Sequence, residues 1–280
     1  MPKRIIFLLI ILILGGSFFL PKLFKKSMIR ETETKLETAP EKLERVSIIT
    51  IYDNYLADSC LKTGWGFSCL IKINGKRILF DTGADSKTLL SNMEKMKIDS
   101  KQIDLIVLSH VHGDHVGGLE GILKGSGDIT VYIPASFPDS MRRNIETYGA
   151  KYQDIKKAEK ISEGVWSTGE LGTWIKEQSL VINSKKGLII ISGCAHPGVV
   201  NIIEKAKEMF PEKNIYLVLG GFHLSGAGDS ELKGIINKFR KIGVQKAAPC
   251  HCSGNRCREL FREEYQDNFM ENGVGKIIEI

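Results

Sequence analysis

The sequence predicts an α/β domain in which two layers, each made of a sheet with helices, pack sheet to sheet. Three observations lead to this prediction. Short apolar segments alternate with amphipathic segments along residues 46–280. A strand hairpin is expected near the start of each half of this range, at 67–81 and at 179–192. The chain has 280 residues, 42% of them hydrophobic, which is enough for a substantial core.

The first half is expected to begin with a strand that ends in a turn at Asp53-Asn54. A two-residue turn at Asn74-Gly75 joins the next two strands, because both residues tolerate the positive φ that such a turn requires. The expected strands are 46–54, 67–73, 76–81, 103–109 and 129–134, and the expected helices are 86–96, 116–123 and 139–148.

The second half repeats this alternation of strands and helices. Its strands are expected over 179–184, 187–192, 214–220, 246–248 and 276–280, and its helices over 198–210, 230–242 and 257–265. The repetition gives each half its own sheet and its own helices, which is the basis for predicting two layers.

The amino-terminal segment has a different character. Residues 5–20 contain no charged side chain, and as a helix they would span about 24 Å. We expect residues 1–25 to form a transmembrane anchor or a signal segment, and the anchor is favoured because no convincing cleavage site follows. Basic residues on both sides leave the orientation open, and a cleaved segment would give a secreted protein. A polar linker over 26–45 then precedes the domain at 46–280.

The net charge of +6 is modest, and part of it comes from lysine and arginine around the apolar amino-terminal run. No block of arginine and aromatic residues typical of a nucleic-acid-binding module is present. We therefore expect a small-molecule substrate and a membrane contact through the amino-terminal helix, but no nucleic acid.

Histidines point to a metal site. Three of the six lie in the run His110-Val111-His112-Gly113-Asp114-His115, and each of the others follows a predicted strand. His110 and His112 are two residues apart at a strand end, so their side chains point the same way and can share one metal. Asp114 and His115 can reach a second metal nearby. A single histidine such as His223 would more often be structural, but gathering four such groups without a ligand is costly.

These motifs resemble the metallo-β-lactamase superfamily, whose signature H-x-H-x-D-H stands here as HVHGDH. Asp81 in FDTG, His196 in SGCAHPG and His251 in PCHCSG match further motifs. The runs GWGFSCLI, EQSL and GGFHL are similar to a subgroup that contains an archaeal dihydropterin–ribofuranosylaminobenzene phosphate synthase and related metal-dependent hydrolases.

The resemblance implies an αββα sandwich with two metal ions. Metal one would be held by His110, His112 and His196, and metal two by Asp114, His115 and His251. Asp81 would support the backbone of the metal loop without being a ligand. The fourth motif of the family normally supplies a bridging Asp, or a Cys in some lactamases. Here GGFHL offers His223, and a neutral imidazole does not bridge two metals. His223 is therefore left as a ligand of one metal, a hydrogen-bond partner of the substrate or a proton donor.

The expected function is hydrolysis of an ester, amide or phosphodiester by a metal-bound hydroxide. Two divalent ions are expected, with Zn²⁺ favoured and iron or manganese as alternatives. Asp114 would orient the nucleophile, and His223 would stabilise the oxyanion or protonate the leaving group. Two alternatives remain: a pterin-forming transferase like the synthase of the subgroup, and a non-enzymatic metal-binding membrane protein.

Several other residues have two interpretations each. Six cysteines allow disulfides or reduced residues at the site. For Cys194, Cys250 and Cys252 we favour packing or supporting roles over metal ligation, because side chains beside a ligand alternate in direction. Asp53 and Asn54 are expected to touch the site or to form a simple turn. Trp65, Trp166 and Trp174 are expected at a substrate mouth or in the core.

Overall fold

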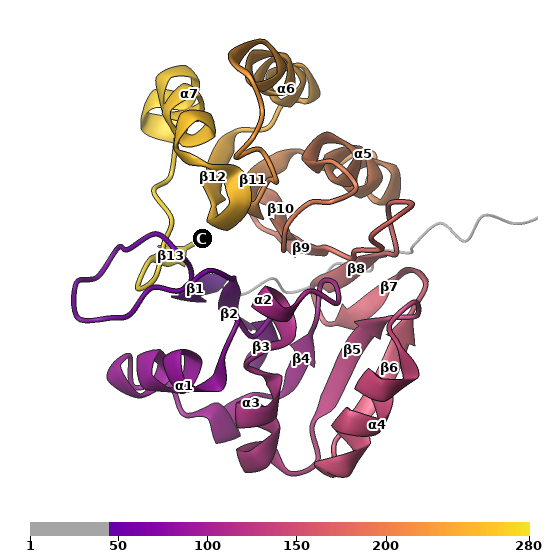
Figure 1. Cartoon of the computed structure of the whole chain (residues 1–280). Coiled ribbons are helices and arrows are strands. Elements are labelled where there is room, and N and C mark those ends of the chain that lie inside the picture. Colours follow the sequence, from indigo (N-terminus) through magenta and orange to yellow (C-terminus); the bar gives the residue numbers. More distant parts are fainter. Residues whose placement is uncertain (1–44) are drawn as a thin grey trace, which may run out of the picture. The chain divides into compact units, whose positions relative to one another are not determined.

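The structure, a computed structural model, describes residues 45–280, which contain two mixed β-sheets (Figure 1). The first sheet has seven strands, in the order β13 (Ile277–Glu279), β1 (Ser47–Tyr52), β2 (Ser68–Ile73), β3 (Lys76–Phe80), β4 (Leu105–Val107), β5 (Thr130–Pro134) and β6 (Lys151–Ile155). The second has six, in the order β12 (Lys246–Cys250), β11 (Ile215–Gly221), β10 (Gly187–Ser192), β9 (Leu180–Ser184), β8 (Val165–Gly169) and β7 (Lys157–Ser162).

Helices cover the outer face of each sheet (Figure 1). Those on the first sheet are α1 (Ser86–Lys95), α3 (Leu119–Ser126) and α4 (Asp139–Thr147), and those on the second are α5 (Val199–Met209), α6 (Asp229–Ile242) and α7 (Asn255–Tyr265). Successive side chains of one strand enter different cores, as the two-residue period of a strand requires. Ile189 lies in the core between the sheets, whereas Ile190 lies in the core beneath α5 and α6.

The first predicted hairpin is confirmed in detail. Strands β2 and β3 pair with Ile73 opposite Lys76, and the two residues between them have φ values of 49° at Asn74 and 73° at Gly75. Positive φ at both positions is the geometry for which an Asn-Gly pair is suited. The second hairpin, β9 with β10, is also present, with Ser184 opposite Gly187.

The helix predicted over 116–123 is present from Leu119, but its predicted start is wrong. The chain forms a short helix α2 (Gly113–Val116) and then the separate helix α3. A Cβ atom on Gly117 would lie 2.0 Å from the carbonyl oxygen of Ala84, and one on Gly118 would lie 2.1 Å from that of Thr82. The glycine pair therefore lets the backbone pack directly on the loop after β3, and this close approach interrupts the helical pattern.

Strands β6, β7 and β8 were not expected from the sequence. Of the five residues of β6 only Ile155 is buried, and of the six residues of β7 only Ile161 is buried. Both strands lie at sheet edges, so most of their side chains face solvent and carry no apolar alternation.

The predicted anchor over 1–25 lies outside the described residues, and so does the linker over 26–45 apart from its last residue. Within residues 45–280, no helix has the length and apolar character needed to cross a bilayer.

Candidate metal centre

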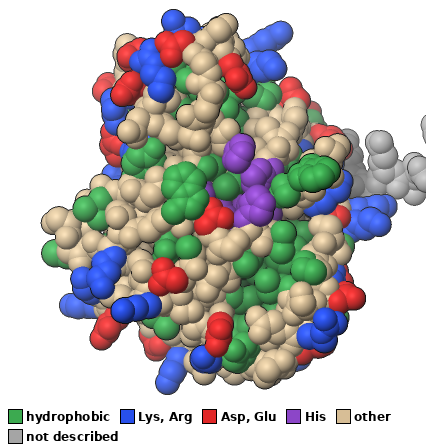
Figure 2. Space-filling view, in the orientation of Figure 1, with side chains coloured by type: hydrophobic (Ala, Val, Ile, Leu, Met, Phe, Trp, Pro, Cys, Tyr) green, Lys and Arg blue, Asp and Glu red, His purple; other side chains and the backbone are tan. Residues whose placement is uncertain are grey.

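All six histidines lie in segments that follow strands at one end of the two sheets. Residues 110–115 follow β4, His196 follows β10, His223 follows β11 and His251 follows β12. Figure 2 shows the histidine side chains gathered in one place on the surface, with apolar side chains on both sides. Rigid strands from both halves of the domain thus bring side chains from distant parts of the sequence to a single site.

One group of side chains is built around His110. Its Nε2 atom lies 3.1 Å from Nδ1 of His112. The ring centroid of His196 lies 4.8 Å from those of both His110 and His112. The Nε2 atom of His196 is buried and has no hydrogen-bond partner. These are the three residues that the resemblance assigns to metal one.

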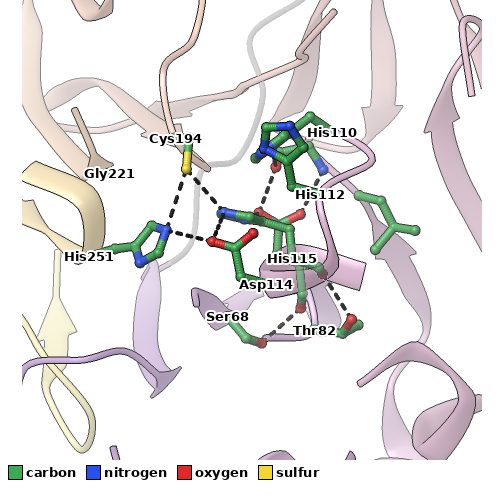
Figure 3. Close-up of polar contacts among 12 residues, drawn as sticks. Ser68, Thr82, His110, His112, Asp114, His115, Cys194, Gly221 and His251 are labelled. Atoms are coloured by element: carbon green, nitrogen blue, oxygen red, sulfur yellow. Dashed lines mark hydrogen bonds and ion pairs between the residues drawn. The ribbon is translucent and has the colours of Figure 1, made fainter. Parts of the chain in front are cut away.

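A second group surrounds Asp114. Its Oδ2 atom lies 3.6 Å from Nε2 of His115 and 3.4 Å from Nε2 of His251 (Figure 3). Both histidines are buried, and the carboxylate of Asp114 is half-buried. The structure therefore also brings together the three residues that the resemblance assigns to metal two.

The hydrogen bonds behind His110 and His115 determine which ring nitrogen carries the proton. Nδ1 of His115 donates to Oδ2 of Asp81 at 2.7 Å. The hydroxyl of Ser109 also donates to this oxygen at 2.7 Å, so its own oxygen accepts from Nδ1 of His110 at 2.9 Å. Since each imidazole uses its proton on Nδ1, each presents the lone pair of Nε2 to the site.

His251 follows the same arrangement through different partners. Its Nδ1 lies 3.1 Å from Oδ1 of Asn54 and donates to it, while Nδ2 of Asn54 donates to the backbone oxygen of His251. Oδ1 of Asp53 accepts from the backbone N–H of His251 at 3.3 Å. Asp53 and Asn54 thus touch the site, which the sequence alone left open.

The converging lone pairs fit divalent cations. Burial and the neighbouring imidazoles lower the pKa of His110, and burial followed by the nearby His223 lowers the pKa of His196 to about 4. Both rings are therefore neutral at pH 7, as metal ligands must be. Lone pairs that face a carboxylate and one another repel unless positive charge lies between them. The donor set of nitrogen, oxygen and sulfur suits Zn²⁺ and also iron or manganese.

Cys194 differs from its predicted packing or supporting role. Its Sγ lies 3.2 Å from Nε2 of His115 and 3.4 Å from Nε2 of His251, so it faces the metal ligands directly (Figure 3). The sequence argument failed because it applied to Cys194 the alternation that holds for residues directly beside a ligand. Cys194 lies two residues before His196, and both side chains reach the centre, with a left-handed φ of 61° at Ala195 between them. All six cysteines are free thiols.

The superfamily profile "Metallo-beta-lactamase superfamily" matches residues 66–207. The chain belongs to the metallo-β-lactamase superfamily. It is 32% identical over 289 residues to the 7,8-dihydropterin-6-methyl-4-(beta-D-ribofuranosyl)-aminobenzene-5'-phosphate synthase of Methanocaldococcus jannaschii. This match covers 85% of this chain and 97% of that relative. An uncharacterized protein of the same organism is 32% identical over 249 residues, 77% of this chain and 93% of the relative.

A solved structure of a metal-dependent hydrolase of the beta-lactamase superfamily has a TM-score of 0.71 and 26% identity, covering 84% of this chain and 99% of that chain. Together with the donor groups, these matches make the chain a metal-dependent enzyme of this superfamily with a candidate His/Asp/Cys metal centre.

Asp81 follows β3 and is fully buried, with a left-handed φ of 57°. Its Oδ1 accepts from the backbone N–H of Ser109 at 2.7 Å, in addition to the two contacts of Oδ2 described above. Of the seven non-glycine residues with positive φ in the described chain, four are at this centre: Asp81, Ala195, His223 and His251. Such strain is typical of sites where the surrounding structure imposes a functional geometry.

Glu177 is a site residue that the sequence reasoning missed. Its side chain is buried, and its carboxylate accepts from the backbone N–H groups of Cys194 at 3.0 Å, Ala195 at 2.9 Å and His196 at 2.8 Å. Burial raises the pKa of Glu177 to about 7, although these donors act in the opposite direction. The only signal in the sequence was the run EQSL, an acidic residue just before an apolar strand.

His223, which the resemblance assigns to the fourth motif, lies outside the two donor groups described above. Its side chain is exposed, and its ring centroid lies 4.4 Å from that of His196. Its donor atom groups instead with the sulfurs of Cys194 and Cys252, all within 4.8 Å of one another. A hydrogen bond with Cys252 raises the pKa of His223.

The three tryptophans separate into different environments. Trp65 is 57% exposed, and its ring lies 5.0 Å from that of His251, so it stands at the rim of the metal centre. Trp166 is buried in the core beneath α5, and Trp174 is 93% exposed. Trp65 is therefore the tryptophan with a direct contact to a site residue.

Proposed function

We propose that this enzyme is a dinuclear-metal-dependent hydrolase acting on an ester, amide or phosphodiester bond of a small molecule. The observation that carries the proposal is the pair of adjoining donor groups, one around His110 and one around Asp114, at an opening on the protein surface. Two bound divalent cations would supply Lewis acidity and activation of water at neutral pH. The fold supplies both sets of ligands from loops held by rigid strands.

Asp114 is suited to hold the attacking water. Two cations bound beside its carboxylate would lower the pKa of Asp114. The carboxylate is therefore ionised at neutral pH and can accept a hydrogen bond from the water that attacks. Its half-buried position leaves one side open to a substrate.

His223 is suited to protonate the leaving group. Its imidazole is exposed beside His196, so it can exchange protons with solvent and reach a substrate bound over the metal centre. It need not be a metal ligand to have this role, and its position outside both donor groups agrees with that assignment.

The test is a screen of ester, amide and phosphodiester substrates with the full-length protein. We expect turnover that is lost on treatment with a chelator and restored by added Zn²⁺, Mn²⁺ or Fe²⁺. His110→Ala should lower turnover by at least about a hundredfold and release metal, whereas His223→Ala should lower turnover and retain metal. Turnover that survives both chelation and His110→Ala would contradict the proposal.

A second candidate is a pterin-forming transferase. It is favoured by the similarity to the Methanocaldococcus jannaschii synthase, which extends over 97% of that relative. The exposed face of Trp65 beside His251 offers a surface on which a flat aromatic ring such as a pterin can stack. A direct assay for condensation of a dihydropterin with a phosphorylated aminobenzene riboside distinguishes the candidates, because a hydrolase gives no condensed product.

A further inference from the structure

We infer that Cys194 bridges the two metals as a thiolate and so occupies the place of the bridging Asp that the fourth motif lacks here. This inference rests on the proposed dinuclear centre. It names a ligand that the fourth motif of the superfamily does not supply, because Cys194 lies two residues before the histidine of the third motif.

The position of the sulfur carries the inference. The Sγ atom lies within 4.8 Å of the donor atoms of Asp114, His115 and His251, and also within 4.8 Å of those of His110 and His196. Among the described residues, Cys194 is the one that belongs to both groups. Two zinc–sulfur bonds of about 2.3 Å that meet at one sulfur can span the separation of about 3.5–4 Å found in two-metal sites.

His223 does not take this position. A neutral imidazole has one free lone pair and cannot bind two ions through the same atom, whereas a thiolate sulfur has three. The exposed ring of His223 lies next to His196 and is absent from both donor groups. By this inference, His223 takes the place of the family's bridging Asp in the sequence, whereas Cys194 takes its place in the structure.

The surrounding fold holds the sulfur in place. Cys194 is 4% exposed, and Glu177 accepts its backbone N–H at 3.0 Å. A Cβ atom on Gly221 would lie 2.3 Å from the carbonyl oxygen of Gly193 and 3.2 Å from Cα of Cys194. The bare backbone at the end of β11 therefore lets the loop after β10 lie deep enough for Sγ to reach both groups.

A different arrangement would use Cys194 with His223 and Cys252 as a separate thiol-rich site. The contacts favour the metal centre over this separate site, because Sγ of Cys194 lies 3.2 Å from Nε2 of His115 and 3.4 Å from Nε2 of His251. Cys252 contacts the backbone oxygen of Cys194 at 3.6 Å and hydrogen-bonds to His223, and its sulfur belongs to neither of the two donor groups. The two arrangements make opposite predictions for a Cys252 substitution.

The experiment is a titration of the metal-free full-length protein with Co²⁺, followed by absorption and electron paramagnetic resonance. Binding releases the thiol proton to solvent and forms sulfur–cobalt bonds. We expect two Co²⁺ per chain and a near-ultraviolet thiolate-to-cobalt band that grows through the first and the second equivalent. We also expect the two ions to show magnetic coupling when both are bound, because they share one sulfur.

Matched variants decide the outcome. Cys194→Ser should lose the thiolate band and bind the second Co²⁺ at least about tenfold more weakly. Cys194→Asp should bind the second ion again but show no band. Cys252→Ser and Cys60→Ser should keep the band and the second ion. A band that saturates at one equivalent, survives in Cys194→Ser or disappears in Cys252→Ser would overturn the bridge, even if two ions bind. If the folded wild-type chain did not bind two Co²⁺, that result would instead overturn the proposed dinuclear centre on which the bridge rests.

Discussion

In the first half of the domain Asp81 fixes the loop that follows β4, and in the second half Glu177 fixes the loop that follows β10. Both carboxylates are buried, and both accept hydrogen bonds from residues beside metal ligands. They differ in the groups from which they accept hydrogen bonds. Asp81 accepts a hydrogen bond from the ring of His115 itself, whereas Glu177 accepts hydrogen bonds only from backbone N–H groups.

This difference separates two ways of supporting a metal centre. A carboxylate that contacts the ring of a ligand sets its tautomer, its orientation and its basicity. A carboxylate that binds only backbone amides sets the path of the loop, so the ligands keep their own chemistry. Substitution of Asp81 should therefore change how a metal is bound, and substitution of Glu177 should change how precisely its ligands are placed.

Asp81→Asn should have the largest effect. The amide cannot accept at both positions, so it loses the contact with the ring of His115 or the contact with the backbone of Ser109. We expect about a hundredfold loss of activity and a comparable loss of affinity for one of the two metals. Competition with a coloured chelator measures the affinity, and unchanged binding of both metals would remove the distinction between the two carboxylates.

Glu177→Gln should have an intermediate effect. The amide retains one acceptor oxygen and loses part of the contact with the three backbone N–H groups between Cys194 and His196. We expect about a tenfold loss of activity with both metals retained. Glu212→Gln, on an exposed turn, is the matched control and should leave activity unchanged. If Glu177→Gln released a metal as readily as Asp81→Asn, the two carboxylates would have the same role.

Asn54→Ala should have the smallest effect of the three. It removes the acceptor for Nδ1 of His251, but the contact is only partly buried and water can replace the lost amide. We expect activity to fall by less than about tenfold, at the lower end of the range for partners of ligating histidines. Activity with increasing Zn²⁺ checks this, because excess metal should restore most of it. A loss as large as that of Asp81→Asn would show that His251 depends on one neutral partner.

Residues of the site that lie in short local motifs could be predicted from the sequence, whereas those that act on distant backbone groups could not. The HVHGDH run and Asp81 were found from the sequence because they lie in short motifs at the ends of strands. Cys194 was misjudged because the alternation that holds for residues directly beside a ligand was applied to a residue two positions from His196. Glu177 was missed because it acts on backbone groups 17 to 19 residues away, and backbone N–H groups carry no sequence signal.

The fold shows a similar limit. Hairpins and amphipathic helices were predicted because their patterns are local, as at Asn74-Gly75. The helix expected over 116–123 is interrupted by the packing of Gly117 and Gly118 on a loop more than thirty residues earlier in the chain. Strands β6 and β7 have too few buried side chains to show a period. Contacts between distant segments explain the first difference, and the exposed edge positions of the two strands explain the second.

Metal analysis of the purified full-length chain tests the central claim most directly. After removal of all metal and reconstitution with Zn²⁺, the account predicts two tightly bound ions per folded chain. It also predicts that His112→Ala retains about one, because the group of Asp114, His115 and His251 is left complete. A folded wild-type chain that binds one ion or none, or an unchanged count of two in His112→Ala, would contradict it.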